Sequence, residues 1–241
     1  MNILITGHCG FIGSALYNHL SKTHNVTGID LKEGIDLLTC GFPKTVNLVI
    51  HLAGKSGVRG SLEDPASYWL NNVEASRRLF EFYNKTRIIY ASSSSAYEPS
   101  RNPYAASKLM IEDIAKGHPA SLGLRLHTVY SGHPREGMFF HKLLNNNLEY
   151  VTNHSRDFIH LNDVMSAFDL IINTPLKGVI DVGTGTSVQI QKICPGLPVR
   201  LNTPYERQWT CADITELTSL GFKPKYTVKD FLTINNIDNK I

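Results

Sequence analysis

The sequence predicts an α/β fold built on a doubly wound parallel sheet, and three observations lead to this. Apolar runs of strand length alternate with segments of helical spacing, which is typical of parallel sheets with helices on both faces. A glycine-rich turn joins the first such run to the first helix. After Ser131 the pattern loosens and prolines interrupt it. We therefore expect a large domain over residues 1–132 and a small lobe over residues 133–241, interleaved with the last strands of the sheet at about 157–183.

The first thirty residues combine the features of a dinucleotide-binding unit. A strand-length run at 3–5 leads into three glycines spaced Gly-x-x-Gly-x-x-Gly, then a helix and a second strand that ends on Asp30. Glycines allow a diphosphate to approach the backbone, and a helix N-terminus favours its negative charge. Asp30 follows Gly13 by 17 positions, near the roughly 20 expected for an acid that binds the adenosine ribose. The expected cofactor contacts here are Gly7, Gly10, Phe11, Ile12, Gly13 and Asp30.

This unit predicts a Rossmann-like domain that binds NAD rather than NADP, because the Asp30 carboxylate would repel a 2′-phosphate. Glycines alone would equally fit an ordinary tight turn beside a solvated acid. The strand, the helix and the acid within one βαβ length favour dinucleotide binding.

The spacing of apolar residues predicts the other elements. We expect further strands at 34–37, 48–53, 87–91, 156–160 and 179–182, and one within 122–129. We expect helices at 14–20, 66–84, 104–116, 139–144 and 163–173, the last capped by Asn162, and short helical pieces after residue 212.

Composition and charge exclude several classes of protein. With 42% hydrophobic and 19% charged residues the chain can form a core and is not disordered. A net charge of +3 is too small to indicate nucleic-acid binding, and no apolar run approaches the roughly 20 residues of a membrane span. The chain enters a strand at once, so we expect no signal peptide. The four cysteines are scattered, which predicts free thiols in the cytoplasm and no metal site.

One group of residues has the pattern of a proton-transfer site. Tyr104 and Lys108 stand at positions i and i+4 of an expected helix, on the same face. An ammonium near a phenol favours the phenolate, which makes a tyrosine a usable acid and base near neutral pH. The serine run 92–95 follows a strand, where α/β folds place ligand-contacting residues. Most Tyr–Lys pairs at this spacing are merely solvated, but the preceding dinucleotide motif favours catalysis.

Several stretches resemble the extended short-chain dehydrogenase/reductases, the NAD-dependent epimerase/dehydratase family. Thr-Gly-x-x-Gly-Phe-Ile-Gly at 6–13 is similar to their opening, and Ile-Tyr-Ala-Ser-Ser-Ser-Ser-Ala-Tyr at 89–97 resembles their Ser-Ser-Ser-x-Val-Tyr-Gly signature. The segment 51–65 is similar to that of UDP-glucuronate 4-epimerases. Further similarity at 71–73, 123–130, 135–138, 156–164, 212–213 and 220–224 extends the resemblance over nearly the whole chain.

The resemblance implies a sugar-nucleotide 4-epimerase of the UDP-glucuronate or UDP-galactose type, with NAD as cofactor and a homodimer formed through the helices at 66–84 and 104–116. It places the catalytic serine on Ser93, beside Tyr104 and Lys108. The implied cofactor contacts are Asp36, Leu37, Leu52, Ala53, Gly54, Lys55, Asn72, Ala91, Tyr104 and Lys108. The implied substrate contacts are Ser93, Ser94, Thr128, Arg135 and Arg207. A polar turn at 36–37 and a surface position for Lys55 stay open as alternatives.

The chain departs from the family pattern in its loops. Glu98 replaces a glycine, and only six residues separate Tyr97 from Tyr104. Ser94 and Ser95 stand where dehydratases carry an Asp-Glu pair, which argues against water elimination. A keto-sugar reductase of the same family, or a dinucleotide-binding protein without turnover, is the alternative to an epimerase.

Overall fold

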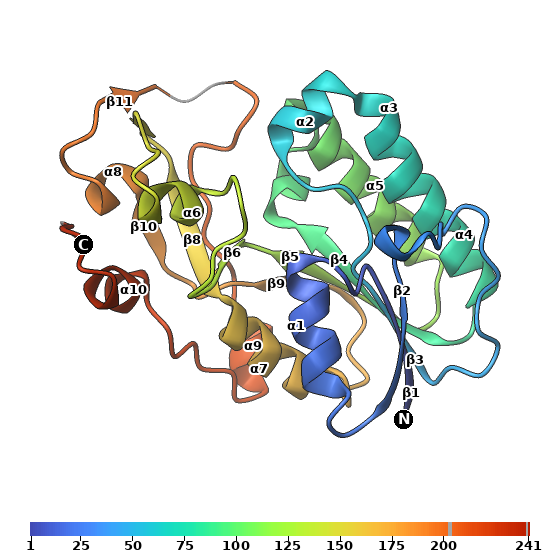
Figure 1. The fold of residues 1–241 in the computed structure, drawn as a ribbon. Helices are drawn as coiled ribbons and strands as arrows, with labels where there is room; N and C mark the ends of the chain where they lie inside the picture. Colours follow the sequence, from blue (N-terminus) through green and yellow to red (C-terminus); the bar gives the residue numbers. More distant parts are fainter. Residues whose placement is uncertain (202–203, 240) are drawn as a thin grey trace. The chain divides into compact units, whose positions relative to one another are not determined.

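The computed structural model describes residues 1–201, 204–239 and 241, and these fold into two compact units. The first unit contains residues 1–125 and 172–180, and the second contains residues 126–171 and 181–241. Figure 1 shows the order of the elements along the chain. Among the described residues, no helix is both long enough and apolar enough to cross a membrane.

A six-stranded sheet with the order β2-β1-β3-β4-β5-β9 confirms the predicted fold class. Its strands are β1 (Asn2–Thr6), β2 (Asn25–Ile29), β3 (Leu48–His51), β4 (Arg87–Ser93), β5 (Ser121–Leu126) and β9 (Gly178–Val182). The pairs β1–β2, β1–β3 and β3–β4 are parallel. Because β2 and β3 lie on opposite sides of β1, the chain reverses direction across the sheet there, and such a switch point is where α/β sheets bind ligands.

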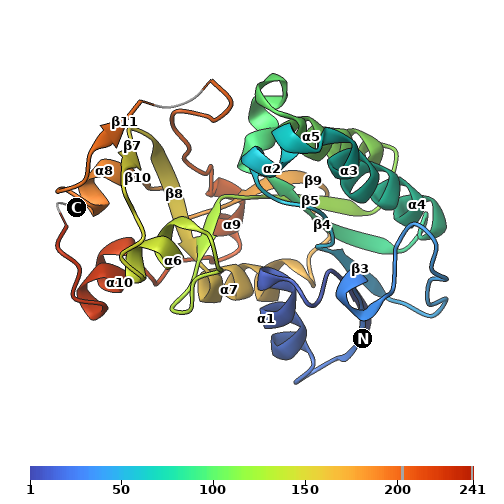
Figure 2. The same cartoon turned by 45° about the horizontal axis from the view of Figure 1, so that its top comes forward.

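Helices cover both faces of this sheet within the first unit. Helix α1 (Phe11–Leu20) lies on one face, whereas α2 (Val58–Glu63), α3 (Pro65–Tyr68), α4 (Ala75–Phe82) and α5 (Pro103–Lys116) lie on the other, as Figures 1 and 2 show. Leu4, Val49 and Ile88 of the strands pack against Leu79 of α4 and Ile111 of α5. This clustering follows from the two-residue period of a strand, which sends alternate side chains to one face.

Two expectations for the first unit need correction. Residues 34–37 form no strand, because Asp36 closes a turn by accepting the Leu38 N–H at 2.9 Å while Leu37 is buried in the core. The helix expected at 66–84 is interrupted by a π-helical segment, Trp69–Glu74, between α3 and α4.

The second unit contains two small sheets and short helices. A three-stranded sheet has the order β10-β8-β6, and a two-stranded sheet pairs β11 with β7. The strands are β6 (Thr128–Tyr130), β7 (Val151–Thr152), β8 (Ser155–His160), β10 (Ser187–Gln189) and β11 (Val199–Arg200). The helices are α6 (Phe139–Leu144), α7 (Leu161–Ile171), α8 (Ile190–Ile193), α9 (Thr215–Ser219) and α10 (Val228–Ile234). Phe140, Phe158 and Phe231 lie at the centre of its aromatic core.

Two expectations for the second unit also differ from the structure. The strand at 155–160 forms, but it pairs with β6 and β10 instead of joining the large sheet. Asn162 is the second residue of α7 and not its cap, since the helix already begins at Leu161.

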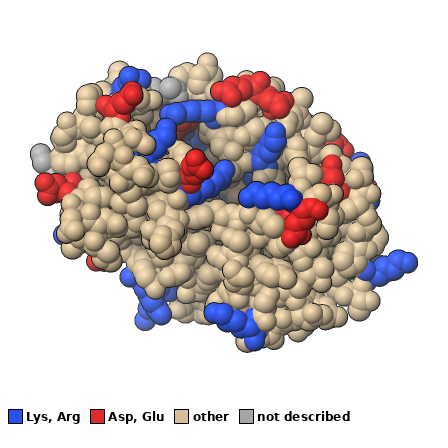
Figure 3. All heavy atoms as spheres, in the orientation of Figure 1, with Lys and Arg blue, Asp and Glu red and all other residues tan. Residues whose placement is uncertain are grey.

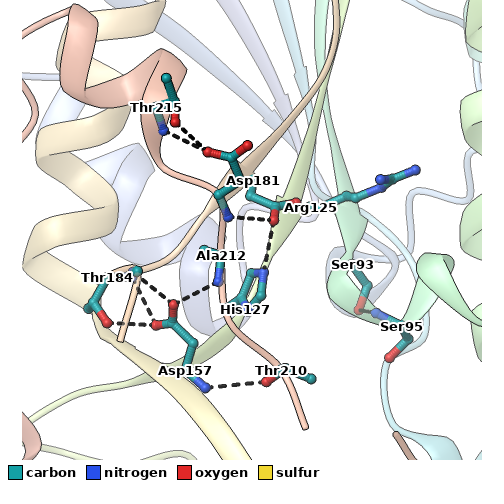
Figure 4. A network of polar contacts seen from close by, with 12 residues as sticks. Ser93, Ser95, Arg125, His127, Asp157, Asp181, Thr184, Thr210, Ala212 and Thr215 are labelled. Carbon is teal, nitrogen blue, oxygen red and sulfur yellow. Dashed lines mark hydrogen bonds and ion pairs between the residues drawn. The ribbon is translucent and has the colours of Figure 1, made fainter. Parts of the chain in front are cut away.

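Buried carboxylates join distant segments of the second unit. Asp157, fully buried on β8, accepts backbone N–H groups of Thr184, Gly185 and Ala212 at 2.8–3.0 Å. Its own N–H donates to the Thr210 hydroxyl, and Figure 4 shows the cluster. Asp163 of α7 accepts the N–H groups of Lys225 and Tyr226 in the same way.

Candidate active site

The glycine turn after β1 is packed so closely that side chains cannot enter it. Gly7 has φ +75°, and a Cβ there would lie 2.6 Å from the backbone nitrogen of Ala53. A Cβ on Gly13 would lie 2.0 Å from the Gly7 carbonyl oxygen. Gly10 is the residue before α1, so Phe11 and Ile12 occupy the first helical turn, whose N–H groups have no partner within the helix. The turn therefore offers free backbone donors beside a bare backbone, as a diphosphate requires.

Asp30 braces this turn from the end of β2. Its Oδ2 accepts the Cys9 N–H at 2.9 Å, and its Oδ1 accepts the Lys32 N–H at 2.9 Å. The Lys32 ammonium donates in turn to the Cys9 carbonyl oxygen at 3.0 Å. Each carboxylate oxygen has a second lone pair that can accept a ribose hydroxyl. Asp30 thus lies where a ribose-binding acid is needed, and it also fixes the loop.

Asn72 connects the segment after β3 with helix α5. Its Oδ1 accepts the Lys55 N–H at 2.7 Å, and its amide donates to the Lys55 carbonyl and to the Ser107 hydroxyl. Gly54 has φ +150° and lies so close to Asn72 that a Cβ would be 2.8 Å from Asn72 Oδ1; the same Cβ would be 3.8 Å from Lys108 Nζ. The predicted contacts Leu52, Ala53, Gly54, Lys55 and Asn72 are therefore brought together, although the Lys55 side chain itself is exposed and lies 3.9 Å from Asp64.

Tyr104 and Lys108 lie on one face of α5, with Lys108 Nζ 5.9 Å from the centroid of the Tyr104 ring. The Lys108 ammonium donates to the Ala91 carbonyl oxygen of β4 at 2.9 Å, and the side chain is buried. The N-cap Asn102, which accepts the Ala105 N–H at 2.8 Å, fixes the first turn of the helix. The Tyr104 ring packs edge-on against Tyr68 at 6.2 Å.

Ser93 is the last residue of β4, the strand whose Ala91 carbonyl accepts the Lys108 hydrogen bond. Its hydroxyl oxygen accepts the Ser95 N–H at 3.1 Å, so the hydroxyl hydrogen remains available to a ligand. The residue is buried, with 7% of its surface exposed, and Figure 4 shows it beside Ser95. Ser94 follows in a short 3₁₀ segment and is half-buried.

Burial shifts the ionisation of two groups at this edge of the sheet. Desolvation lowers the pKa of Lys108 to about 8, so the ammonium still carries its charge at neutral pH. Desolvation and the nearby Lys108 charge lower the pKa of His51 to about 3, so that ring is neutral. His51 bonds to the Thr6 and Ser76 hydroxyls at 2.7 and 2.8 Å, as expected of a core histidine at a strand end.

The other predicted substrate contacts belong to the second unit. Thr128 begins β6 and is half-buried. Arg135 lies in the exposed segment before α6, and Arg207 is half-buried, with its carbonyl oxygen accepting from the Arg156 guanidinium at 2.8 Å. The Arg156 guanidinium also pairs with Glu206 at 3.1 Å, so it serves the second unit's own structure.

A family model described as the NAD dependent epimerase/dehydratase family matches residues 3–183. The chain belongs to this family. The family consists of NAD-dependent epimerases and dehydratases, so NAD is its cofactor.

Proteins similar to this family member over nearly their full length are known. Protein CapI of Staphylococcus aureus is 27% identical, covering 95% of this chain and 96% of the relative. A UDP-glucuronic acid 4-epimerase from Bacillus cereus, solved with UDP-glucuronic acid and NAD, has a TM-score of 0.84 at 27% identity and 97% coverage of both chains. MoeE5, solved with UDP-glucose and NAD, has a TM-score of 0.82 at 28% identity, covering 97% of this chain and 96% of its own.

This epimerase/dehydratase family member is shorter than such relatives. An uncharacterized protein of Methanocaldococcus jannaschii is 27% identical over an alignment of 305 positions that covers 96% of this chain and 94% of the relative. Because this chain has 241 residues, at least 64 of those positions have no counterpart in it.

Three features of the first unit were not predicted from the sequence. Ser107 links Asn72 to α5, and a buried Glu112 carboxylate holds Arg125 in a two-point pair with N–O distances of 2.9 and 2.6 Å. His8, Cys9 and Glu33 converge beside the glycine turn. The spacing of the cysteines does not reveal this cluster, because its carboxylate lies 24 positions after Cys9 in the sequence.

Proposed function

We propose that this protein is an NAD-dependent sugar-nucleotide 4-epimerase whose substrate is a UDP-hexose or a UDP-hexuronate. The observation that carries the proposal is the Tyr104–Lys108 pair, with Lys108 anchored to the Ala91 carbonyl at 2.9 Å. This arrangement places a phenol next to a fixed positive charge at the edge of the sheet where ligands bind. The Bacillus cereus relative and MoeE5, each solved with a UDP-sugar and NAD, support the substrate class.

The residues of the first unit fit NAD. The glycine turn fits the diphosphate because any Cβ at Gly7 or Gly13 would strike backbone atoms. Asp30 fits the adenosine ribose, with Asp36 and Leu37 on the adenine side. A bound NAD would supply the hydride acceptor for the oxidation and the hydride donor for the reduction. Lys108 and Asn72 would hold the nicotinamide ribose and the segment beside it.

Side chains of this protein would carry out the proton transfers of the proposed reaction. The Tyr104 oxygen takes the proton of the sugar 4-hydroxyl as that carbon is oxidised, and returns it when the carbon is reduced on its other face. The Lys108 ammonium stabilises negative charge on the Tyr104 oxygen through space. The Ser93 hydroxyl, whose oxygen is fixed by the Ser95 N–H, donates to the reacting oxygen and sets its direction.

Substrate recognition is proposed for the lobe at 133–241 together with Thr128. Arg135 and Arg207 carry the positive charge that a diphosphate or a uronate carboxylate requires. The first domain, 1–132, is proposed to supply the cofactor site and Ser94. Ser94 and Ser95 leave no acid to eliminate water, so a 4,6-dehydratase is disfavoured although one such enzyme, from Dictyostelium discoideum, is 27% identical over 76% of this chain.

The test is the interconversion of UDP-glucuronate and UDP-galacturonate, then of UDP-glucose and UDP-galactose, with NAD⁺ added. Tyr104→Phe removes only the phenolic oxygen, so NAD binding should survive while kcat falls by about 10²–10⁴-fold. Tyr226→Phe, at an exposed tyrosine of the second unit, is the matched control and should keep its rate. Lys108→Met should lose both activity and part of the NAD affinity.

Two outcomes would overturn this proposal. An unchanged rate in Tyr104→Phe would remove the mechanism. A parent protein that binds NAD but converts no sugar nucleotide would favour the non-catalytic alternative, whereas stoichiometric oxidation of a reduced cofactor by a keto-sugar nucleotide would favour the reductase.

Cofactor choice is tested separately by calorimetry with NAD and NADP on the cofactor-free protein. The Asp30 carboxylate should make NAD the tighter ligand, since it repels a 2′-phosphate. Tighter binding of NADP would contradict the role of Asp30.

We also propose a cytoplasmic homodimer. Trp69, Leu70 and Met110 are exposed on the π-segment and on α5, which contact one another within the first unit. Exposed apolar groups on neighbouring helices are typical of an interface. Phe82 of α4 is also exposed, at 46%, whereas Phe80 is buried in the core and cannot contribute to an interface. Light scattering that finds a monomer at micromolar concentration would contradict the dimer.

A further inference from the structure

The sequence suggested no metal site, but the glycine turn carries a cluster of three side chains with metal-binding atoms. His8 and Cys9 lie between Gly7 and Gly10, and Glu33 ends the 3₁₀ turn Leu31–Glu33 that follows Asp30. His8 Nε2 lies 3.4 Å from Glu33 Oε2 and 3.6 Å from Cys9 Sγ. One ligand atom of each residue lies within 4.8 Å of the other two.

These two distances are those of a tetrahedral zinc site. With Zn–S near 2.3 Å and Zn–N and Zn–O near 2.1 Å, tetrahedral angles put S and N about 3.6 Å apart and N and O about 3.4 Å apart. An ordinary N–H···O hydrogen bond would instead be about 2.9 Å. The His8–Glu33 and His8–Cys9 distances therefore fit an ion bound between these side chains, and the cluster's ligand atoms all lie within 4.8 Å of one another.

The backbone that carries these side chains is already fixed. Asp30 accepts the N–H of Cys9 with one oxygen and that of Lys32 with the other, so the two ligand-bearing turns are tied to the same carboxylate. Gly7 N–H bonds to the Ile29 carbonyl at 2.8 Å. A site whose backbone is ordered before the ion arrives loses little conformational entropy on binding.

The His8 ring packs beside Tyr17 and against the bare backbone of Gly28. Its centroid lies 5.2 Å from that of the Tyr17 ring, with the two planes tilted by 43°, and the ring lies over Gly28, where a Cβ would come within 2.5 Å of the ring atoms. The side chain is 12% exposed, and Nδ1 is buried without a hydrogen-bond partner among the described residues. The packing of the ring against Gly28 orients Nε2 toward Cys9 and Glu33.

We propose that His8, Cys9 and Glu33 bind one divalent transition-metal ion, with Zn²⁺ the ion that fits best. A thiolate, an imidazole and a carboxylate form the ligand set of borderline-soft ions and not of Mg²⁺ or Ca²⁺, which prefer oxygen alone. The thiolate and the carboxylate balance the charge of the ion, the thiol proton leaves to solvent, and water takes the fourth position. The site is separate from Tyr104 and Lys108 and does not depend on the proposed epimerase activity.

The experiment uses the full chain, reduced and freed of metal by chelation, without NAD. Titration with Co²⁺ should give one equivalent of binding with a thiolate-to-cobalt charge-transfer band in the near ultraviolet, and Zn²⁺ should displace it. Calorimetry should give one Zn²⁺ per chain. Cys9→Ser should abolish the charge-transfer band and weaken Zn²⁺ binding at least about tenfold.

Glu33→Gln changes an exposed side chain, so it should fold normally and still weaken Zn²⁺ binding while keeping the charge-transfer band. Cys40→Ser is the matched control, because Cys40 is a free, half-buried cysteine outside the cluster, and it should bind as the parent does. The proposal is overturned if the parent shows no stoichiometric Zn²⁺ binding, if Cys9→Ser or Glu33→Gln binds Zn²⁺ as tightly as the parent, or if Cys40→Ser loses the band.

Discussion

The two units bury polar groups in different ways. In the first unit, buried polar groups bond mainly to other side chains: the Glu112 carboxylate pairs with Arg125. A chain of neutral partners also crosses the interior, from the Thr6 hydroxyl through His51 to the Ser76 hydroxyl, which donates to the Asn72 carbonyl. In the second unit, the charged carboxylates of Asp157 and Asp163 accept backbone N–H groups from segments far away in the sequence. The first unit relies on its regular sheet for shape, whereas the second, with short strands, relies on carboxylates to hold its loops.

We expect the largest effect from a substitution in the glycine turn of the first unit, where the backbone leaves least room for a side chain. Gly13→Ala adds a Cβ 2.0 Å from the Gly7 carbonyl oxygen, so the turn must shift. A shift of about 1 Å in a binding site can cost roughly 100-fold in activity. Calorimetry should find NAD binding lost. Gly132→Ala in the second unit, where a Cβ meets nothing within 4 Å, should bind NAD normally.

Acid should disrupt the chain of neutral partners around His51 in the first unit. The pKa of His51 falls from 6.5 to about 3 on folding, so below pH 6.5 the unfolded chain takes up a proton that the folded chain refuses. The stability that this histidine contributes is therefore complete above pH 6.5 and is lost as the pH falls toward about 3. At about 1.4 kcal/mol per pKa unit, this amounts to between about 3 and 5 kcal/mol. Urea unfolding of His51→Gln should show a weaker loss between pH 7 and pH 4 than the parent does, and equal slopes would contradict the assignment.

The second unit should depend on the charge of Asp157. Asp157→Asn keeps the shape but places an amide against backbone N–H groups, in a fully buried position. Hydrogen bonds to charged groups contribute about 1.5–3 kcal/mol each, so the free energy of unfolding should fall by about 3 kcal/mol. Asp213→Asn, at an exposed carboxylate that bonds only within its own turn, should change little. Chemical denaturation measures both, and equal losses would mean that Asp157 is not the connection we describe.

The smallest expected effect compares two helix caps. Asn102→Ala removes the cap of α5, and Thr227→Ala removes the capping box of α10. Each should cost about 1 kcal/mol of unfolding free energy. Only Asn102→Ala should also lower the proposed epimerase activity, because α5 carries Tyr104 and Lys108 in its first two turns. If both variants retained full activity, the cap would have no positioning role.

The same difference between the units decided what could be predicted from sequence. Local patterns in the first unit predicted the fold class and the family: its strands and helices, the glycine turn, Asp30 and the Tyr-Lys spacing. The sheet order and the family match confirm both predictions. The roles of individual residues stay predictions. Residues 34–37 were predicted as a strand but form a turn, because the Asp36 side chain accepts a hydrogen bond from the backbone N–H of Leu38, two residues later.

The second unit gave fewer local signals. The pairing of β8 with β6 and β10 depends on contacts between segments about 30 residues apart, and local residue spacing does not predict such pairings. Asp157 was visible only as part of a family-like motif, whereas its partners near 184 and 212 come from the folded chain. The His8, Cys9 and Glu33 cluster was missed for the same reason, since β2 separates its two halves.

The brace formed by Asp30 has a consequence for any attempt to redesign the cofactor preference. A change to a small neutral residue is the obvious way to admit a 2′-phosphate, but it would also remove both hydrogen bonds that tie Cys9 and Lys32 together. The substitution would remove the repulsion of the 2′-phosphate, but it would also leave the loop less ordered before the cofactor binds. The second effect would weaken NADP binding and so offset the first. A successful switch therefore needs a second substitution that supplies a new acceptor for the Cys9 N–H.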